Sequence, residues 1–241
     1  MNITSPTARS DALLTLDGRA VPLAVRRSPR ARSLRLSVDP RDGQLRLTVP
    51  ARAAIGPALA WAARQEAWIV AALDRVPPPV PLAPGALVPF EGVPRLVSWC
   101  PEGGRAVRLE GDRLHVGGPA ELVRARLLRW LKSEALSRLE GETRALAAAH
   151  GIAVGRIRVG DARSRWGSCS SGGDIAYSWR LVLAPVAVRQ ATVAHELAHR
   201  LHMDHSPAFH AATARLLGRD PAPERQWLRT HGAWLHGIGR E

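Results

Sequence analysis

The sequence Ala194-His195-Glu196-Leu197-Ala198-His199 is the most informative segment in the C-terminal half of this chain. It lies in a segment without glycine or proline over residues 186–203, which predicts a helix. Helical residues four positions apart share one face, so His195 and His199 can bind a single zinc ion. Glu196, rotated by about 100° from His195, is placed to act as a general base on water. The alternative is a packed helix with two surface histidines.

Two further histidines compete to be the third metal ligand. His202 follows His195 by seven positions, about 10.5 Å along a straight helix, so the three rings would have to converge from a line. His205 precedes Ser206-Pro207, a favourable N-cap and first position of a following helix, so the chain must turn there. A ligand on a turn can approach the metal from the side, as tetrahedral coordination requires. We therefore expect His205 as the third ligand.

Periodicity and turn residues predict an α+β domain around this helix, over residues 119–241. The spacing of leucines predicts a long helix from 119 to about 150. Gly151 suits the position after that helix, where left-handed backbone is common. The other expected elements are strands at 156–160 and 174–183 and helices at 186–203, 207–218 and 222–236.

The residues before position 119 predict a β-rich N-terminal domain, with a domain boundary near residue 118. Alternating hydrophobicity and turn residues predict a half-buried antiparallel sheet at its start. Helical spacing follows over 55–75, and a proline-rich connector spans 77–84. The expected strands lie at 12–16, 21–26, 33–38, 44–49, 86–90, 94–99, 106–110 and 113–116.

Composition restricts the class of protein. The chain has 241 residues, of which 46% are hydrophobic, enough for a real core and too many for a disordered chain. No window approaches the roughly 18 uninterrupted apolar residues of a membrane span. The first residues have no signal-peptide pattern, and Cys100 and Cys169 are the only cysteines. We therefore expect a globular cytoplasmic protein with no membrane partner.

The chain is strongly basic, with 34 basic against 21 acidic residues and a formal charge of +13. All the basic residues except Lys132 are arginine. Residues 1–52 carry ten arginines against four aspartates. Such a segment can form a basic face for nucleic acid, phosphate or another anionic partner, or simply a solvated surface.

The chain resembles the YgjP-like metallopeptidases, relatives of the SprT-like and other H-E-x-x-H zinc proteases. The resemblance rests on Arg165-Trp-Gly-Ser-Cys169, Trp179-Arg-Leu-Val-Leu-Ala-Pro185, the H-E-x-x-H helix and His205-Ser-Pro-Ala-Phe209, in this order and spacing. The paired N-terminal strands, Val49-Pro50 and Trp68-Ile69 are also similar, so the resemblance covers most of the chain. Ser178 and His210 depart from the family pattern, in which asparagine and an aromatic residue are usual.

The resemblance implies a small zincin-type catalytic domain, of the minimal gluzincin-like kind, after the β-rich region. It also implies that His195, His199 and His205 bind zinc and that Glu196 is the catalytic base. The segment Arg165–Cys169 is expected near the zinc helix as a structural loop, with the Cys169 thiolate as a conceivable extra ligand.

Three further side chains are candidates for contacts with the substrate or the transition state. Arg165 and Arg180 flank the expected site and can stabilise an oxyanion or an anionic substrate, although structural salt bridges explain them equally well. Tyr177 precedes the zinc helix and can donate a hydrogen bond to a tetrahedral intermediate. We expect the cleft between this helix and strand 174–183, whose edge can pair with an extended peptide.

These observations favour a zinc-dependent metallopeptidase acting on a protein or peptide. Two alternatives stay open. The same chemistry on a phosphoanhydride would give a nucleoside triphosphate pyrophosphatase, although no glycine-rich phosphate loop or acidic magnesium cluster is present. A nucleic-acid-associated factor of SprT-like type would use the arginine-rich sheet of residues 21–52 against phosphates.

Overall fold

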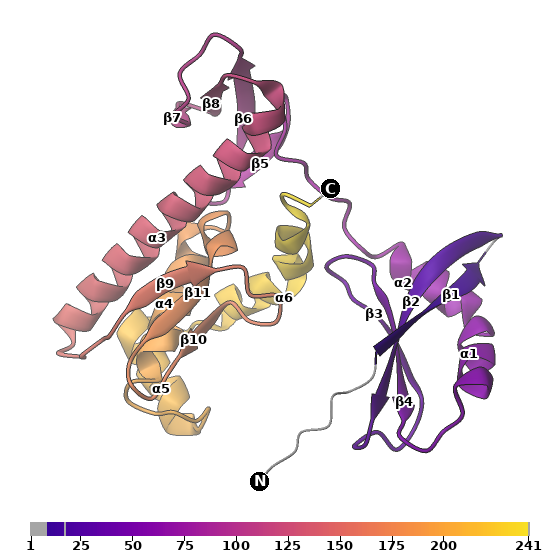
Figure 1. Ribbon diagram of the computed structural model, residues 1–241. Coiled ribbons are helices and arrows are strands. Elements are labelled where there is room, and N and C mark those ends of the chain that lie inside the picture. The colour runs from indigo at the N-terminus through magenta and orange to yellow at the C-terminus, as the bar shows by residue number, and fades with distance from the viewer. Residues whose placement is uncertain (1–8, 17, 241) are drawn as a thin grey trace. The chain divides into compact units, whose positions relative to one another are not determined.

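The computed structural model describes residues 9–16 and 18–240, and it divides the chain into two compact units (Figure 1). Unit 1 is Met1–Pro78 and unit 2 is Pro79–Glu241. The described residues form three mixed sheets and six α-helices, which confirms the α+β prediction. No helix in the described ranges is long and apolar enough to cross a membrane.

Unit 1 contains a four-stranded sheet with the strand order β1-β2-β4-β3. The hairpin of β1 and β2 is antiparallel, β4 runs parallel to β2, and β3 closes the sheet antiparallel to β4. The sheet is therefore mixed rather than purely antiparallel as expected. The strands are Arg9–Leu16, Arg19–Ser28, Arg35–Val38 and Leu45–Pro50.

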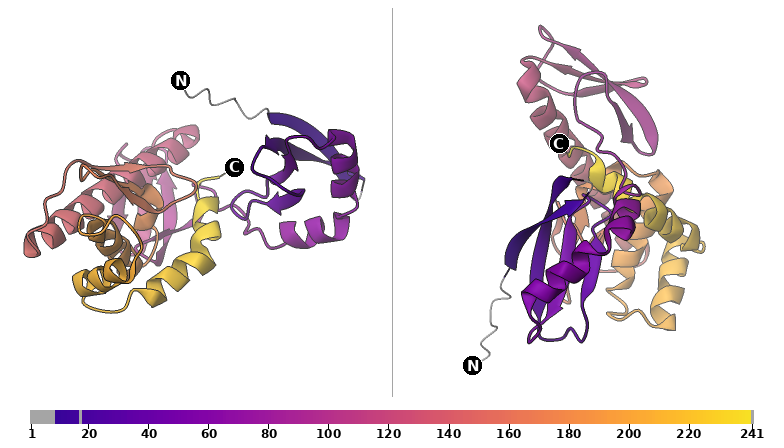
Figure 2. Two further views of the ribbon diagram at one scale, coloured as in Figure 1. Left: turned by 90° about the horizontal axis from the view of Figure 1, so that it is seen from below. Right: turned by 90° about the vertical axis from the view of Figure 1, so that its right-hand side faces the viewer.

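Two helices cover one face of this sheet, α1 (Ile55–Ala63) and α2 (Glu66–Leu73). Both lie on the same side of the strands in Figure 1 and in the right-hand view of Figure 2. The sequence predicted one helix over 55–75, but the chain tightens at Gln65, whose N–H bonds to the carbonyl of Ala62 three residues back. The core between helices and sheet comprises Leu14, Leu16, Leu23, Val25, Leu45, Leu47, Val49, Ala58, Ala62 and Ile69.

A buried carboxylate ties the turn before β4 to the sheet. Asp39 is 5% exposed and accepts hydrogen bonds from Arg41, at 2.7 Å from Nε, while Arg46 Nη2 lies 2.8 Å from Oδ2. The bond from Arg41 is the main cause that lowers the pKa of Asp39 from 3.8 to about 2. A lowered pKa means that the ionised carboxylate stabilises the folded state above pH 4, and that this contribution is lost as the pH falls through about 2.

We expect Asp39→Asn to lower the free energy of unfolding of unit 1 by about 1–2 kcal/mol at pH 7. The difference from the unchanged chain should shrink as the pH falls from 5 toward 2, because Asp39 becomes protonated first in the unfolded and then in the folded chain. Hydrogen–deuterium exchange of peptides from β4 over this pH range measures it. A deficit that does not change with pH would contradict the electrostatic origin.

Unit 2 begins with a second four-stranded mixed sheet, of order β5-β6-β8-β7, which repeats the strand order and directions of the first. Its strands are Leu87–Phe90, Val93–Cys100, Arg108–Glu110 and Arg113–Gly117. A short 3₁₀ turn (Ala120–Leu122) then leads into the long helix α3 (Val123–Ala149). Gly151 follows this helix with φ 64°, as predicted for that position.

The division between the units lies at residue 78 and does not coincide with the predicted boundary near 118. The reason is that the β5–β8 sheet shares its core with the C-terminal helices. The turn between β5 and β6 makes this connection. The N–H groups of Glu91 and Gly92 bond to the carbonyls of Val182 and Leu183, at 2.7 and 3.0 Å. Gly92 lies so close to Pro185 that a β-carbon there would be 2.9 Å from its Cα.

The rest of unit 2 is a small three-stranded sheet and three helices. The strands β9 (Ile157–Gly160), β10 (Gly167–Cys169) and β11 (Ile175–Ser178) have the order β10-β11-β9. The expected strand over 174–183 is shorter, because a 3₁₀ turn occupies Trp179–Val182. The helices are α4 (Val186–Ala198), α5 (Pro207–Leu217) and α6 (Ala222–Gly237). Helix α4 contacts α3, α5, α6 and β10 and is the centre of the unit.

Candidate metal centre

Helix α4 carries the H-E-x-x-H residues at its C-terminal end. Most of its residues are buried, among them Val193, Ala194, Leu197 and Ala198, because neighbouring elements surround it. His195 lies in its last turn, and His199 is the residue that caps it. The two histidines therefore point from one face at a helix end, where the chain is free to turn.

The helix ends at Ala198, five residues before the predicted end at 203. Beyond His199 the chain turns back on itself, with the N–H of His202 bonded to the carbonyl of Ala198 at 2.9 Å. This turn brings His205 beside His195, and their Nε2 atoms are 3.4 Å apart. His202 does not join the cluster through its ring. The structure thus brings together the three histidines that the sequence puts forward, His195, His199 and His205.

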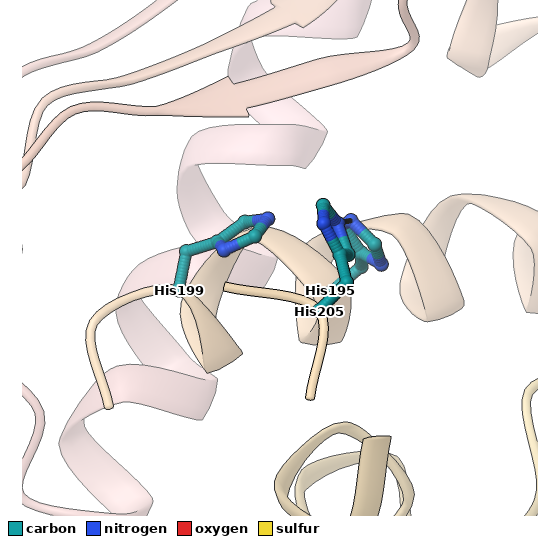
Figure 3. Close-up of side chains that lie close together, drawn as sticks. All are labelled: His195, His199 and His205. Atoms are coloured by element: carbon teal, nitrogen blue, oxygen red, sulfur yellow. Dashed lines mark hydrogen bonds between the residues drawn. The ribbon is translucent and has the colours of Figure 1, made fainter. Parts of the chain in front are cut away.

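The three imidazole rings gather at the end of α4 (Figure 3). One nitrogen from each ring lies within 4.8 Å of the others, a spacing that one metal ion can bridge. The Nδ1 of His199 lies 3.2 Å from the carbonyl oxygen of His202, which can only accept a hydrogen bond. Nδ1 therefore carries the hydrogen, and the Nε2 lone pair of His199 is left for a metal. Burial, followed by the neighbouring His199 and His205, lowers the pKa of His195 to about 4, so this ring is neutral at physiological pH.

A buried phenylalanine supports the whole cluster. Phe209 is fully buried, and its ring centre lies 4.9, 4.5 and 4.8 Å from those of His195, His199 and His205. Helix α5 places it, because the Ser206 hydroxyl caps the helix and accepts from the N–H of Phe209 at 3.4 Å. Phe209 belongs to the quoted motif His205–Phe209, but the sequence did not predict this supporting role. The sequence signal that points to this role is the position of Phe209, four residues after His205.

We expect Phe209→Leu to lower the affinity for Zn²⁺ by about tenfold or more, because the rings lose the surface that orients them. Competition with a chromophoric chelator measures the affinity. Phe90→Leu is the matched control, since Phe90 is equally buried in the same unit and packs on Trp130. If both variants lost stability but retained full metal affinity, Phe209 would be core packing alone.

Glu196 is a buried carboxyl group beside the histidines. It is 4% exposed, and burial raises its pKa to about 7. Its Oε2 atom is buried and has no hydrogen-bond partner among the described residues. A β-carbon at Gly167 would overlap the Glu196 carboxyl group, so only glycine leaves room for it there. The Arg165–Cys169 segment therefore packs directly against the Glu196 carboxyl group.

A cavity of about 450 Å³ opens in front of the histidines and Glu196. The whole segment from Arg165 to Cys169 forms one wall, and residues from α4, from the turn between α4 and α5, and from α5 and α6 form the rest. Arg165 is thus the one substrate-contact candidate that the structure brings to the cavity. Burial raises the pKa of the Cys169 thiol, and its Sγ lies 3.4 Å from the carbonyl oxygen of Ser170. Cys169 is not in the cluster of metal-ligand atoms formed by the described residues.

The structure places the other two candidates away from the cavity. Tyr177 is 1% exposed, and its hydroxyl lies 3.0 Å from that of Thr143 on α3. Arg180 forms an ion pair with Asp161, and its guanidinium stacks on Trp179. Both side chains are engaged in packing unit 2.

An ion network centred on the buried Arg189 holds α4 against the rest of unit 2. Arg189 on α4 is 3% exposed. Its Nη2 donates to Glu142 at 2.6 Å, and its Nη1 donates to Glu91 at 3.0 Å. Arg138 on α3 shares the Glu91 carboxylate at 2.7 Å. Because all these partners are satisfied, the network fixes α4 relative to α3 and the β5–β6 turn.

The comparisons with known proteins point to a family. The family model described as "YgjP-like, metallopeptidase domain" matches residues 32–231. No curated protein and no solved structure is significantly similar to the chain. The matched range includes the three histidines, Glu196, Gly167 and Phe209.

Proposed function

This chain belongs to the YgjP-like metallopeptidase family, and we propose that it cleaves peptide bonds with a zinc ion held by His195, His199 and His205. The observation that carries the proposal is the juxtaposition of three imidazole nitrogens with the buried, unpartnered Oε2 of Glu196 at one cavity.

The donor set fits zinc. Three neutral imidazoles are a ligand set of catalytic zinc sites and leave a fourth position open. The hydrogen bond from His199 to a backbone carbonyl is the outer interaction that orients such ligands. A zinc ion bound here supplies the Lewis acidity that polarises a substrate carbonyl and makes water a nucleophile at neutral pH.

Glu196 moves the proton in this proposal. Its free Oε2 accepts a proton from the attacking water and later delivers it to the nitrogen of the leaving amine. Arg165, which lines the cavity, is the arginine placed to contact an anionic group of the substrate or transition state.

The substrate backbone has a strand to pair with. The sequence suggested the edge of strand 174–183, but β11 is the central strand of its sheet, between β9 and β10. Strand β10 is one of the two edge strands, and its residues Gly167, Ser168 and Cys169 line the cavity. We infer that an extended peptide pairs with the free edge of β10, which would carry it past Glu196.

Product analysis tests the proposal. Zinc-loaded protein is incubated with an unfolded protein and mixed nucleoside triphosphates, beside a Glu196→Gln control, and the products are identified by mass spectrometry. New peptide ends that are absent from the control support a peptidase. Nucleoside monophosphate with pyrophosphate would instead make the chain a nucleotide hydrolase and overturn the proposal.

A substitution at Gly167 tests the role of Glu196 without changing a proposed metal ligand. We expect Gly167→Ala to lower kcat by about 10²-fold with Zn²⁺ affinity kept, because the new methyl group displaces the Glu196 carboxylate. Gly172→Ala is the matched control, since a β-carbon there meets no atom closer than 3.8 Å. Equal activity of the two variants would show that the carboxylate does not need this space.

A further inference from the structure

The two faces of the sheet in unit 1 are chemically different. Alternate residues of β2 and β4 point into the core under α1 and α2, and the residues between them form the opposite, open face. The strand register places Arg26, Thr48 and Arg35 in one row across β2, β4 and β3. The adjoining row holds Ala24, Arg46 and Ser37. Arginines and hydroxyl groups thus alternate over this open face.

The positive charge of the open face is largely uncompensated. Arg26 and Arg35 are exposed, and the loop between β2 and β3 adds the exposed Arg30 and Arg32. Within the described part of the chain, none of these four arginines forms an ion pair. Arg46 is different, because it shares the buried Asp39. The described strand residues place one acidic side chain on the same face, Asp11, which lies on the outer strand β1.

We propose that this open face binds the sugar–phosphate backbone of nucleic acid, without preference for base sequence. Neighbouring strands are about 4.8 Å apart, so Arg26 and Arg35, on either side of β4, are about 10 Å apart. A nucleic-acid strand presents a phosphate every 3.4 Å or more over that distance. The arginine fork suits phosphate oxygens, and the hydroxyl of Thr48 can donate to phosphate or sugar, whereas that of Ser37 donates to the carbonyl of Arg46 at 3.5 Å.

The side chains of the open face also determine whether it can recognise base sequence. Strands β1 to β4 contain no aromatic residue, so the sheet offers no platform on which bases can stack. Contacts to phosphate alone carry no sequence information. A membrane surface fits less well, because Leu13, at the edge of the sheet, is the one large apolar side chain of these strands that is strongly exposed. The proposal does not depend on the peptidase site, every residue of which lies in unit 2.

Fluorescence anisotropy of a labelled 20-nucleotide oligo(dT) tests the proposal with the full chain, at about 50 to 200 mM salt. The test variant is Arg26→Gln/Arg35→Gln. The matched control is Arg64→Gln/Arg75→Gln, which removes the same charge from exposed positions after α1 and α2. We expect the test variant to bind at least tenfold more weakly. The slope of log affinity against log salt should become shallower by about 1.4, and the control should bind within twofold of the unchanged chain.

Several results would overturn the proposal. One is no binding even at about 50 mM salt, and another is an equal loss in both variants, which would reflect net charge alone. Polyglutamate and anionic phosphatidylserine vesicles are measured in parallel. If either bound as tightly as oligo(dT) and was lost in the same variant, the face would be a general anion surface or a membrane contact. Thermal unfolding of both variants checks that unit 1 remains folded.

Discussion

Glu196→Gln should reduce kcat for peptide cleavage by about 10³-fold or more while the protein still binds zinc at full stoichiometry. The amide has the size of the carboxylate but cannot take a proton from water. Because Glu196 is buried and its Oε2 has no partner among the described residues, the substitution removes no described hydrogen bond from that atom. The fold should therefore survive, and the loss should lie in kcat rather than in metal content.

Glu121→Gln is the matched control, since it makes the same chemical change at an exposed residue before α3. Steady-state cleavage of a fluorogenic peptide and zinc analysis by atomic emission are measured for both variants. Full turnover by Glu196→Gln with zinc bound would exclude Glu196 as the base. A matching loss in Glu121→Gln would show that the assay responds to charge instead.

His205→Ala should weaken Zn²⁺ binding by more than about 100-fold, which exceeds the effect expected from losing an outer partner of a ligand. His205 comes from the turn after α4, and its Nε2 lies 3.4 Å from that of His195. Two imidazoles alone leave the ion half coordinated by protein. Activity should disappear with the metal.

His202→Ala separates the two candidates for the third ligand. The carbonyl of His202, not its ring, contacts His199, so this variant should retain zinc affinity within a few-fold. Isothermal titration with Zn²⁺ measures both variants. If His202→Ala lost the metal and His205→Ala kept it, the proposed ligand set would be wrong.

The histidine cluster could be predicted from sequence because its rule is local. Two of its histidines follow from the period of one helix, and the third follows from the turn signal Ser206-Pro207 next to His205. The same local rules predict the position of most strands, the long helix α3 and the left-handed Gly151. Hydrophobic alternation and turn chemistry act over a few residues, which is the range that one sequence reveals.

The remaining features depend on contacts between distant residues. Nothing local shows that the β5–β6 turn bonds to residues 182 and 183, and this contact is why unit 2 begins at Pro79. Local sequence rules also do not predict that Gly167 lies beside Glu196, because this contact joins separate elements, β10 and α4. Tyr177 and Arg180 looked available because they are polar, whereas Thr143 and Asp161 engage them. Whether a polar side chain remains free to contact a substrate depends on its neighbours in the folded protein.

The repeated strand order allows both four-stranded sheets to pair early in folding. Each four-stranded sheet is made from a contiguous segment, Arg9–Pro50 or Leu87–Gly117, so its pairings close short loops. Contacts between residues close in sequence form quickly, whereas distant ones pay a larger entropic cost first. The cavity joins β10, α4, α5 and α6, and α4 in turn needs Glu91 and Glu142. During synthesis, the strand pairings of both sheets can thus form before His195, His199 and His205 have been translated, and the chemistry is the last property that the nascent protein acquires.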